Sequence, residues 1–257
     1  MVQQSGYSCD KIHRIKNYWL SKQPPALSKI DLKQAEYLSF DGTYFHKNGC
    51  LAIVMDYVHK KLLSYDCIER ERYDTVYPIL LYLKEQGLNP KAITVDGHKQ
   101  IINVIKTIWP EVIIQRCLFH IQNQGLMWLR THPKTQAGRD LRFLLYSLAS
   151  IENEEQKNTF IKRYNQWLEE YECSMKQFSK NVVANKDLRR AKSLINNAMD
   201  DMFHFIKDQN IAKTTNQLEG FYSQLKHQYR NHRGLSETHK IAYLKWFCYF
   251  KSIKNSN

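Results

Sequence analysis

Hydrophobic and polar positions alternate along the first half of the chain in a way that predicts a sheet. Apolar runs, alternating or continuous, predict five strands at residues 36–46, 49–58, 61–68, 92–95 and 112–116. Helical spacing of the apolar positions predicts helices at residues 73–86 and 98–108. Tight connections make the first three strands antiparallel neighbours, and the strand–helix–strand order of the last two implies parallel pairing.

The second half of the chain shows helical periodicity only. From about residue 121 to 210, apolar positions recur at helical spacing in three stripes, which predict the core faces of a helical bundle. These stripes are Leu141, Leu144, Leu145 and Leu148; Phe160, Tyr164, Trp167, Leu168 and Tyr171; and Leu188, Ala191, Leu194, Ile195, Ala198, Met202 and Ile206. Two further helices are predicted within residues 211–257, the first ending near Gly234.

The segment "GYSCDKIHRIKNYWL" predicts a turn and then a helix that Ser8 can cap. Its apolar stripe leaves Lys11 and Arg14 on another face, as on the recognition helix of a helix-turn-helix. Two prolines follow, so residues 1–25 are interpreted as a partial helix-turn-helix remnant and a linker.

The net charge of +13 is concentrated at the two ends of the chain. Residues 1–34 carry six Lys/Arg against two Asp/Glu, and residues 211–257 carry eight against two. Basic ends indicate a polyanionic partner, most often nucleic acid, although a generally basic protein is the alternative.

Composition narrows the class of protein further. No apolar run approaches the roughly 20 residues of a membrane span, and the first residues lack the apolar core of a signal peptide. The six cysteines are dispersed without any Cys-x-x-Cys pair, which is typical of reduced thiols. We therefore expect a cytoplasmic protein that does not enter a membrane.

Two aspartates lie where apolar strands pass or end. Asp41 falls within the first strand, in "YLSFDGTYFH", and Asp96 ends the fourth, in "AITVDGHKQ". The strand order predicts a ribonuclease H-like sheet, in which strands one and four are neighbours, so the two carboxylates can meet. Adjacent carboxylates repel unless a cation lies between them, and Mg²⁺ or Mn²⁺ is the usual cation. The alternative is that Asp96 only supports the turn before the next helix.

Glu219, in "TTNQLEGFYSQLK", is the candidate third acid, on a late helix that packs against the sheet. On that helix Glu219 begins a line of basic residues, Lys226, Arg230 and Arg233, beside an apolar stripe. The alternative is a capping box formed by Asn216 and Glu219.

In their order, the segments "FDGTYF", "TVDGHKQI", "QRCLFHI" and "TTNQLEGFYSQLK" resemble a DDE transposase of the Mutator-like and bacterial insertion-sequence class. Asp41 and Asp96 are 55 residues apart, and Asp96 and Glu219 are 123 residues apart. Such a long second interval resembles that class, in which an all-helical insertion precedes the last acid. The resemblance implies an α/β fold with a ribonuclease H-like mixed sheet flanked by helices. Its core would comprise residues 34–120 and 211–257, with an all-helical insertion at 121–210 before the last catalytic helix.

The resemblance also implies the chemistry. Asp41, Asp96 and Glu219 would bind two Mg²⁺ or Mn²⁺ ions for phosphodiester hydrolysis at transposon ends and strand transfer into target DNA. Lys226, Arg230 and Arg233, with Lys11 and Arg14 on the N-terminal helix, would bind DNA. The partners would be double-stranded terminal inverted repeats and target DNA, bound by a homodimer or higher multimer at a bacterial nucleoid.

The segment "CLFH" matches the Cys-x-x-His element of that class and gives Cys117 and His120. Two ligands are too few for a zinc site, so these residues are interpreted as an active-site wall or as supports for the carboxylates. Relatives carry a complete DNA-binding region ahead of the core, so we expect an N-terminally truncated copy. The alternatives are an inactive DNA-binding remnant that interferes with full-length transposase, and a structure-selective nuclease on the same fold.

Overall fold

A computed structural model describes residues 6–25, 32–45, 49–177, 182–232 and 234–254. Its five strands are β1 (Tyr37–Tyr44), β2 (Cys50–Asp56), β3 (Lys61–Ile68), β4 (Ala92–Val95) and β5 (Ile113–Arg116). They form one sheet in the order β3-β2-β1-β4-β5, antiparallel from β3 to β1 and parallel from β1 to β5. All five predicted strands are confirmed, and their order and directions are those of the ribonuclease H-like α/β layout.

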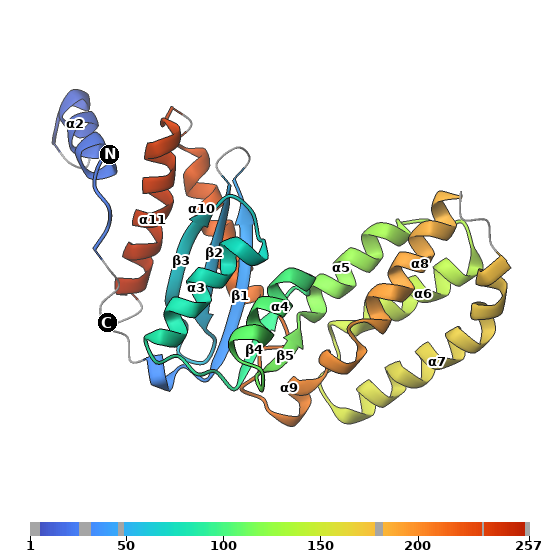
Figure 1. The fold of residues 1–257 in the computed structure, drawn as a ribbon. Coiled ribbons are helices and arrows are strands. Elements are labelled where there is room, and N and C mark those ends of the chain that lie inside the picture. The colour runs from blue at the N-terminus through green and yellow to red at the C-terminus, as the bar shows by residue number, and fades with distance from the viewer. Residues whose placement is uncertain (1–5, 26–31, 46–48, 178–181, 233, 255–257) are drawn as a thin grey trace.

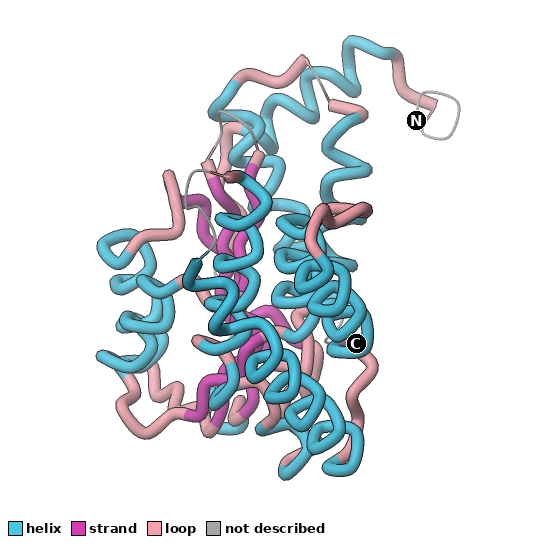
Figure 2. Tube along the Cα trace, turned by 90° about the vertical axis from the view of Figure 1, so that its right-hand side faces the viewer, coloured by secondary structure: helices cyan, strands magenta, loops and turns pink. Residues whose placement is uncertain are grey.

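Helices cover both faces of the sheet (Figure 1), and the view turned by 90° shows strands between helices on either side (Figure 2). One face is covered by α3 (Tyr73–Glu85) and α4 (Lys99–Ile108), the other by α10 (Asn216–Arg230) and α11 (Glu237–Lys254). Ala52 and Val54 of β2 pack toward α3 and α4, whereas Leu51 and Ile53 pack toward α10 and α11. This burial on both faces explains the continuous apolar run of β2.

The remaining helices form a bundle beside the β5 edge of the sheet (Figure 1). They are α5 (Leu118–Leu129), α6 (Gln136–Leu148), α7 (Glu154–Gln177), α8 (Val183–Asn196) and α9 (His204–Lys207), and short 3₁₀ turns lie at Leu32–Gln34 and Met199–Asp201. The three predicted apolar stripes lie in the core of this bundle or pack against it. Because α5 starts directly after β5, the helical segment begins three residues before the predicted position.

Polar side chains and backbone bonds fix where the chain leaves the bundle and returns to the sheet. The buried Gln115 amide donates to the Met202 carbonyl at 2.7 Å, and its oxygen accepts from the Phe205 N–H at 3.3 Å. The Thr94 hydroxyl donates to the Ala212 carbonyl at 2.7 Å. These bonds fix the returning chain beside β4 and β5, just before α10 begins.

Helix α2 (Cys9–Leu20) begins at the predicted cap, because the Ser8 hydroxyl accepts a bond from the Lys11 N–H at 3.3 Å. Its apolar stripe is mostly exposed; Leu20 is buried, against Leu235 and Ala242. The helix lies beside α11, and its interpretation as part of a helix-turn-helix stays a prediction.

Helix α10 is shorter than predicted. Helix α10 ends at Arg230 with Asn231 as its C-cap, so the prediction that Gly234 ends it is wrong. Within the part of the chain that the structure describes, none of the helices combines the length and the apolar character needed to span a lipid bilayer.

Candidate active site

Parallel pairing of β1 with β4 brings Asp41 and Asp96 to the same end of the sheet. Ser39 pairs with Thr94 in this ladder, and each aspartate lies two residues further along its own chain. Because the two strands run parallel, this register directs both aspartates to the same end of the sheet. The predicted neighbourhood of the first and fourth strands is therefore confirmed.

Asp41 lies in the interior, with only 8% of its surface exposed. Burial raises the pKa of its carboxyl to about 7; the charge of His120 opposes this rise, and the charges of Asp96 and Glu219 add to it. The Tyr222 hydroxyl of α10 donates to the Asp41 backbone carbonyl at 2.6 Å, which holds α10 against β1. A buried carboxylate with other acids nearby is the arrangement that a cation would stabilise.

Asp96 shapes the turn between β4 and α4. Its Oδ1 accepts a bond from the His98 N–H at 2.9 Å, and Gly97 between them has a φ of +103°. The interpretation of Asp96 as a turn residue is therefore confirmed, although His98 is the N-cap of α4. The turn fixes the Asp96 backbone at the same end of the sheet as Asp41, so a turn function and a site function are compatible.

Arg116, the last residue of β5, packs against this turn. Its contact with the turn was not predicted from the sequence. Only 5% of its surface is exposed, and its guanidinium occupies the space beside Gly97, where an added Cβ would lie 1.9 Å from Cζ. Its Nη2 donates to the Asp96 backbone carbonyl at 3.4 Å, while its Nε has no hydrogen-bond partner among the described residues. Burial lowers the pKa of the guanidinium, and the nearby Asp96 opposes this effect.

Glu219 lies in the first turn of α10, beside a histidine. Its Oε1 is 3.6 Å from His120 Nε2. The N-cap of α10 is Thr215, which makes no side-chain capping bond, and Asn216 is already the first helical residue. The capping-box interpretation is therefore wrong, because the Glu219 side chain contacts α5 and the proposed cap residue lies inside the helix.

Cys117 and His120 join the start of α5 to the start of α10. Cys117 Sγ accepts bonds from the Thr215 N–H at 3.3 Å and from its hydroxyl at 3.5 Å, and that hydroxyl lies 3.4 Å from His120 Nδ1. The hydrogen bond to Cys117 is the main cause that raises the pKa of His120 to about 9, with the charges of Asp41 and Asp96 adding to it. A positively charged imidazole therefore lies among the acids at neutral pH.

Glu71 is a fourth carboxylate at this end of the sheet, and sequence reasoning missed it. Its carboxyl group lies against Gly42, where an added Cβ would approach it to 2.6 Å. Burial raises its pKa to about 7, and the charges of Asp96 and Asp41 add to the rise. Glu71 lies in the polar segment between β3 and α3, where a half-buried acid has no distinctive sequence pattern; the one signal is Gly42 directly after Asp41.

The acids share this end of the sheet without converging on one point. Among the described residues, no group of three or more His, Cys, Asp or Glu side chains is placed to hold a metal ion. Cys117 and His120 therefore do not form part of a zinc site among these residues. The donor chemistry nevertheless suits a hard divalent cation, which prefers carboxylate oxygens. The buried Asp41 carboxylate also fits, because a cation would stabilise the charged form that burial disfavours. Binding would require the side chains to close around the ion.

The predicted DNA-contacting residues are divided between two helices. Lys226 and Arg230 lie on α10 beside the stripe that packs on the sheet, and Lys226 Nζ is 5.8 Å from the centroid of the Phe45 ring. Arg233 lies outside the described residues. Lys11 and Arg14 are exposed on α2, which lies beside α11. These two residues are therefore on a different helix from Lys226 and Arg230.

A comparison with protein families matches most of this chain. Residues 50–246 match the profile described as "Transposase, Mutator family". The matched segment contains Asp96, Cys117, His120 and Glu219 and begins nine residues after Asp41. No curated protein matches the chain.

Proposed function

The chain belongs to the Mutator family of transposases, and we propose that it cuts DNA at the ends of a mobile element and joins the freed 3′ ends to target DNA. One observation carries this proposal. The β1–β4 register and the docking of α10 bring acids from positions 41, 96 and 219 to one end of a ribonuclease H-like sheet. Both steps transfer a phosphodiester, so one site can serve both.

In this proposal Asp41, Asp96 and Glu219 bind two Mg²⁺ or Mn²⁺ ions through carboxylate oxygens. When bound, such ions activate the attacking water or 3′-hydroxyl and stabilise the leaving 3′-oxygen. The chain's own contribution is position: β1 holds Asp41 in the interior, the turn after β4 fixes Asp96, and α10 carries Glu219. Among these residues Asp41 depends most on a cation, because burial disfavours its charge.

His120 and Cys117 position the third acid. The two residues fix Thr215 and therefore the first turn of α10, and the imidazole contacts Glu219 directly. Its positive charge offsets part of the repulsion between the acids in the absence of cations. We assign both residues to positioning, with no contact to the reacting phosphate.

Lys226 and Arg230 contact DNA phosphates next to the acids in this proposal, which positions the duplex without reading its sequence. Arg233, Lys11 and Arg14 are further DNA-binding residues in this proposal. Two copies of the chain would act together, because an element has two ends that must be joined to one target.

The competing function is a DNA-binding remnant that occupies element ends without cutting them. It accords with carboxylates that do not converge on one point. The two functions differ in one measurable property, metal-dependent cleavage.

The test uses supercoiled plasmid DNA that carries the sequences flanking the gene, incubated with the purified protein and Mg²⁺ or Mn²⁺. We expect nicking that requires the metal and is abolished by Asp96→Asn. The control is Asp74→Asn, which removes an exposed carboxylate from the first turn of α3 and should leave nicking unchanged. Wild-type protein that is folded and binds the DNA but never nicks it supports the remnant. Cleavage of branched DNA without joining supports the structure-selective nuclease.

A further inference from the structure

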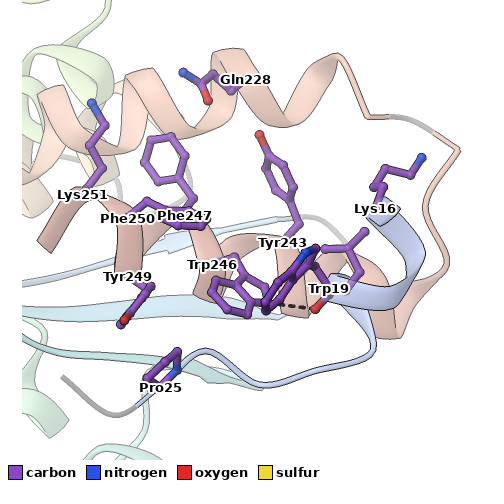
Figure 3. Close-up of a pocket in the computed structure, with 11 residues that line it drawn as sticks. Lys16, Trp19, Pro25, Gln228, Tyr243, Trp246, Phe247, Tyr249, Phe250 and Lys251 are labelled. Atoms are coloured by element: carbon purple, nitrogen blue, oxygen red, sulfur yellow. Dashed lines mark hydrogen bonds between the residues drawn. The ribbon is translucent and has the colours of Figure 1, made fainter. Parts of the chain in front are cut away.

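A pocket of about 730 Å³ lies between α2, α10 and α11, away from the acids (Figure 3). Its size is within the range of about 300–1,000 Å³ that is usual for ligand sites. Six of its eleven lining residues are aromatic: Trp19, Tyr243, Trp246, Phe247, Tyr249 and Phe250. A pocket lined by this many aromatic rings suits a ligand with flat apolar faces.

Trp246 builds the pocket by holding α2 against α11. Its indole N–H donates to the Trp19 carbonyl at 3.0 Å and to the Lys22 carbonyl at 3.1 Å. The Trp19 and Trp246 rings meet edge to face with centroids 5.5 Å apart. The wall of the pocket is therefore a fixed part of the fold.

Two of these rings remain open to solvent although both contact other rings. Trp19 is 52% exposed and Phe250 is 56% exposed, and the Phe250 ring stacks on Trp246 at 5.4 Å between centroids. Figure 3 shows the Trp19 and Trp246 rings together and Phe250 further along α11. Large exposed rings in one patch indicate a binding surface, because folding does not require them to be exposed together.

Two lysines lie beside these rings. Lys16 and Lys251 line the pocket, and none of the described residues that line it is acidic. Helix α2 carries three Lys/Arg against one acid, and α11 carries four lysines against one acid. Aromatic rings between cations are the usual means of binding single-stranded nucleic acid, in which bases stack on rings and phosphates lie near lysines.

We propose that this pocket binds unpaired nucleotides of a DNA strand by stacking their bases on Phe250 and Trp19, with Lys16 and Lys251 near the phosphates. The proposal rests on the proposed function, which brings DNA ends to this protein. Unpaired nucleotides are required because neighbouring base pairs cover the base faces in a duplex. A second copy of the chain fits less well, since its α2 and α11 would bring like charge to a basic surface.

The pocket is separate from the acids but lies within reach along one helix. Gln228 of α10 lines the pocket, nine residues after Glu219. Nine residues correspond to about 14 Å along the helix axis and to a half-turn around it. A strand that leaves the acids would therefore pass across α10 to reach the rings, so the pocket would hold DNA displaced from the duplex.

The test measures the affinity of the full chain for a labelled 12-nucleotide oligothymidine and for a blunt duplex of the same length, by fluorescence anisotropy in EDTA. We expect Phe250→Ala to weaken binding of the single strand by about 5- to 150-fold, the usual range for loss of one stacked base. Binding of the duplex should change less than twofold. Trp19→Ala should act in the same direction.

Phe143→Ala is the matched control, since Phe143 is 70% exposed on α6 in the distant bundle (Figure 1). Unchanged single-strand affinity in Phe250→Ala overturns the proposal, as does an equal loss in Phe143→Ala. A change from dimer to monomer in Phe250→Ala, with single-strand affinity retained, would assign the pocket to contact between copies instead. Binding in EDTA does not depend on cleavage, so a failure here is distinct from a failure of the nicking assay.

Discussion

Replacing Asp41 by asparagine should stabilise the folded protein at pH 8 while it abolishes DNA cleavage. In the folded protein burial raises the pKa of this carboxyl to about 7, whereas its usual value is 3.8. Below about pH 3 the group is protonated in both the folded and the unfolded chain, so it imposes no penalty. Between pH 4 and 7 the unfolded chain loses the proton first, and the stability of the folded protein falls.

The size of this penalty follows from the two pKa values. The difference between 3.8 and about 7, at about 1.4 kcal/mol for each tenfold change, corresponds to a loss on the order of 4 kcal/mol at pH 8. An asparagine amide carries no charge, but its burial costs about 1–3 kcal/mol unless it is fully hydrogen-bonded. We therefore expect a net gain of about 2 kcal/mol at pH 8 and a small net loss at pH 4.

The assay is urea unfolding followed by circular dichroism, in EDTA, at intervals from pH 4 to 8. The free energy of unfolding should decline with pH in the wild type and remain flatter in Asp41→Asn. A variant that is less stable than the wild type by the same amount at every pH would refute the reasoning.

Asp56→Asn is the matched control for this experiment, because Asp56 is also buried in the sheet but well bonded. Its carboxylate accepts bonds from the Val58 and His59 N–H groups at 3.0 and 3.2 Å and lies 2.6 Å from His59 Nδ1. The same substitution should therefore destabilise the protein at pH 8, by about 1–3 kcal/mol. Opposite signs of the stability change would distinguish Asp56, whose charged form the fold stabilises, from Asp41, whose charged form is destabilised by burial.

Two further substitutions test the geometry around the acids. Gly97→Ala should destabilise the protein by about 2–4 kcal/mol in urea unfolding, because φ is +103° and a Cβ would displace the Arg116 guanidinium; Gly220→Ala, where nothing lies within 4 Å, should be neutral or slightly stabilising, and equal effects would contradict this account. His120→Gln should lower the melting temperature at pH 7, and the difference from wild type should shrink above pH 9. The raised pKa of about 9 makes the charged imidazole stabilising at low pH and lost as pH rises through 9, so a constant difference at pH 7 and 10 would count against it.

The sheet was predictable from the sequence because its signals are local and repeated. Each strand has an apolar run, and the short connections leave few possible pairings for the first three. The strand–helix–strand order then specifies that β4 and β5 are parallel, and the ribonuclease H-like layout places β4 beside β1. The candidate acids Asp41 and Asp96 follow from this order, because both lie at strand positions that meet at one end of the sheet.

Residues that act through long-range contacts were not predictable in the same way. Glu71 lies in a polar connection, and its burial depends on the absence of a side chain at Gly42. Arg116 is an ordinary strand-end arginine until the turn at Gly97 is folded against it. Neither contact produces a periodic pattern or a motif in the sequence, so only the tertiary structure reveals these contacts.

The capping-box and Gly234 predictions failed for a related reason. Sequence rules treat a helix as if it were isolated, whereas α10 begins where Cys117 and His120 bind Thr215. It ends at Arg230, four residues before the glycine. The exposed stripe of α2 likewise has the spacing of a core face, and spacing alone does not say whether a partner covers it.

The hydrogen bonds between Thr94 and Ala212 and between Leu118 and Lys213 connect β4 and the start of α5 to chain that is made about a hundred residues later. A ribosome therefore completes Asp41 and Asp96 long before the helix that bears Glu219 emerges. The growing polypeptide holds only two of the three acids until position 219 of 257 has been translated. Under the proposed function, an incomplete chain would therefore lack one of the three acids and could not cleave DNA until the helix that bears Glu219 has been made.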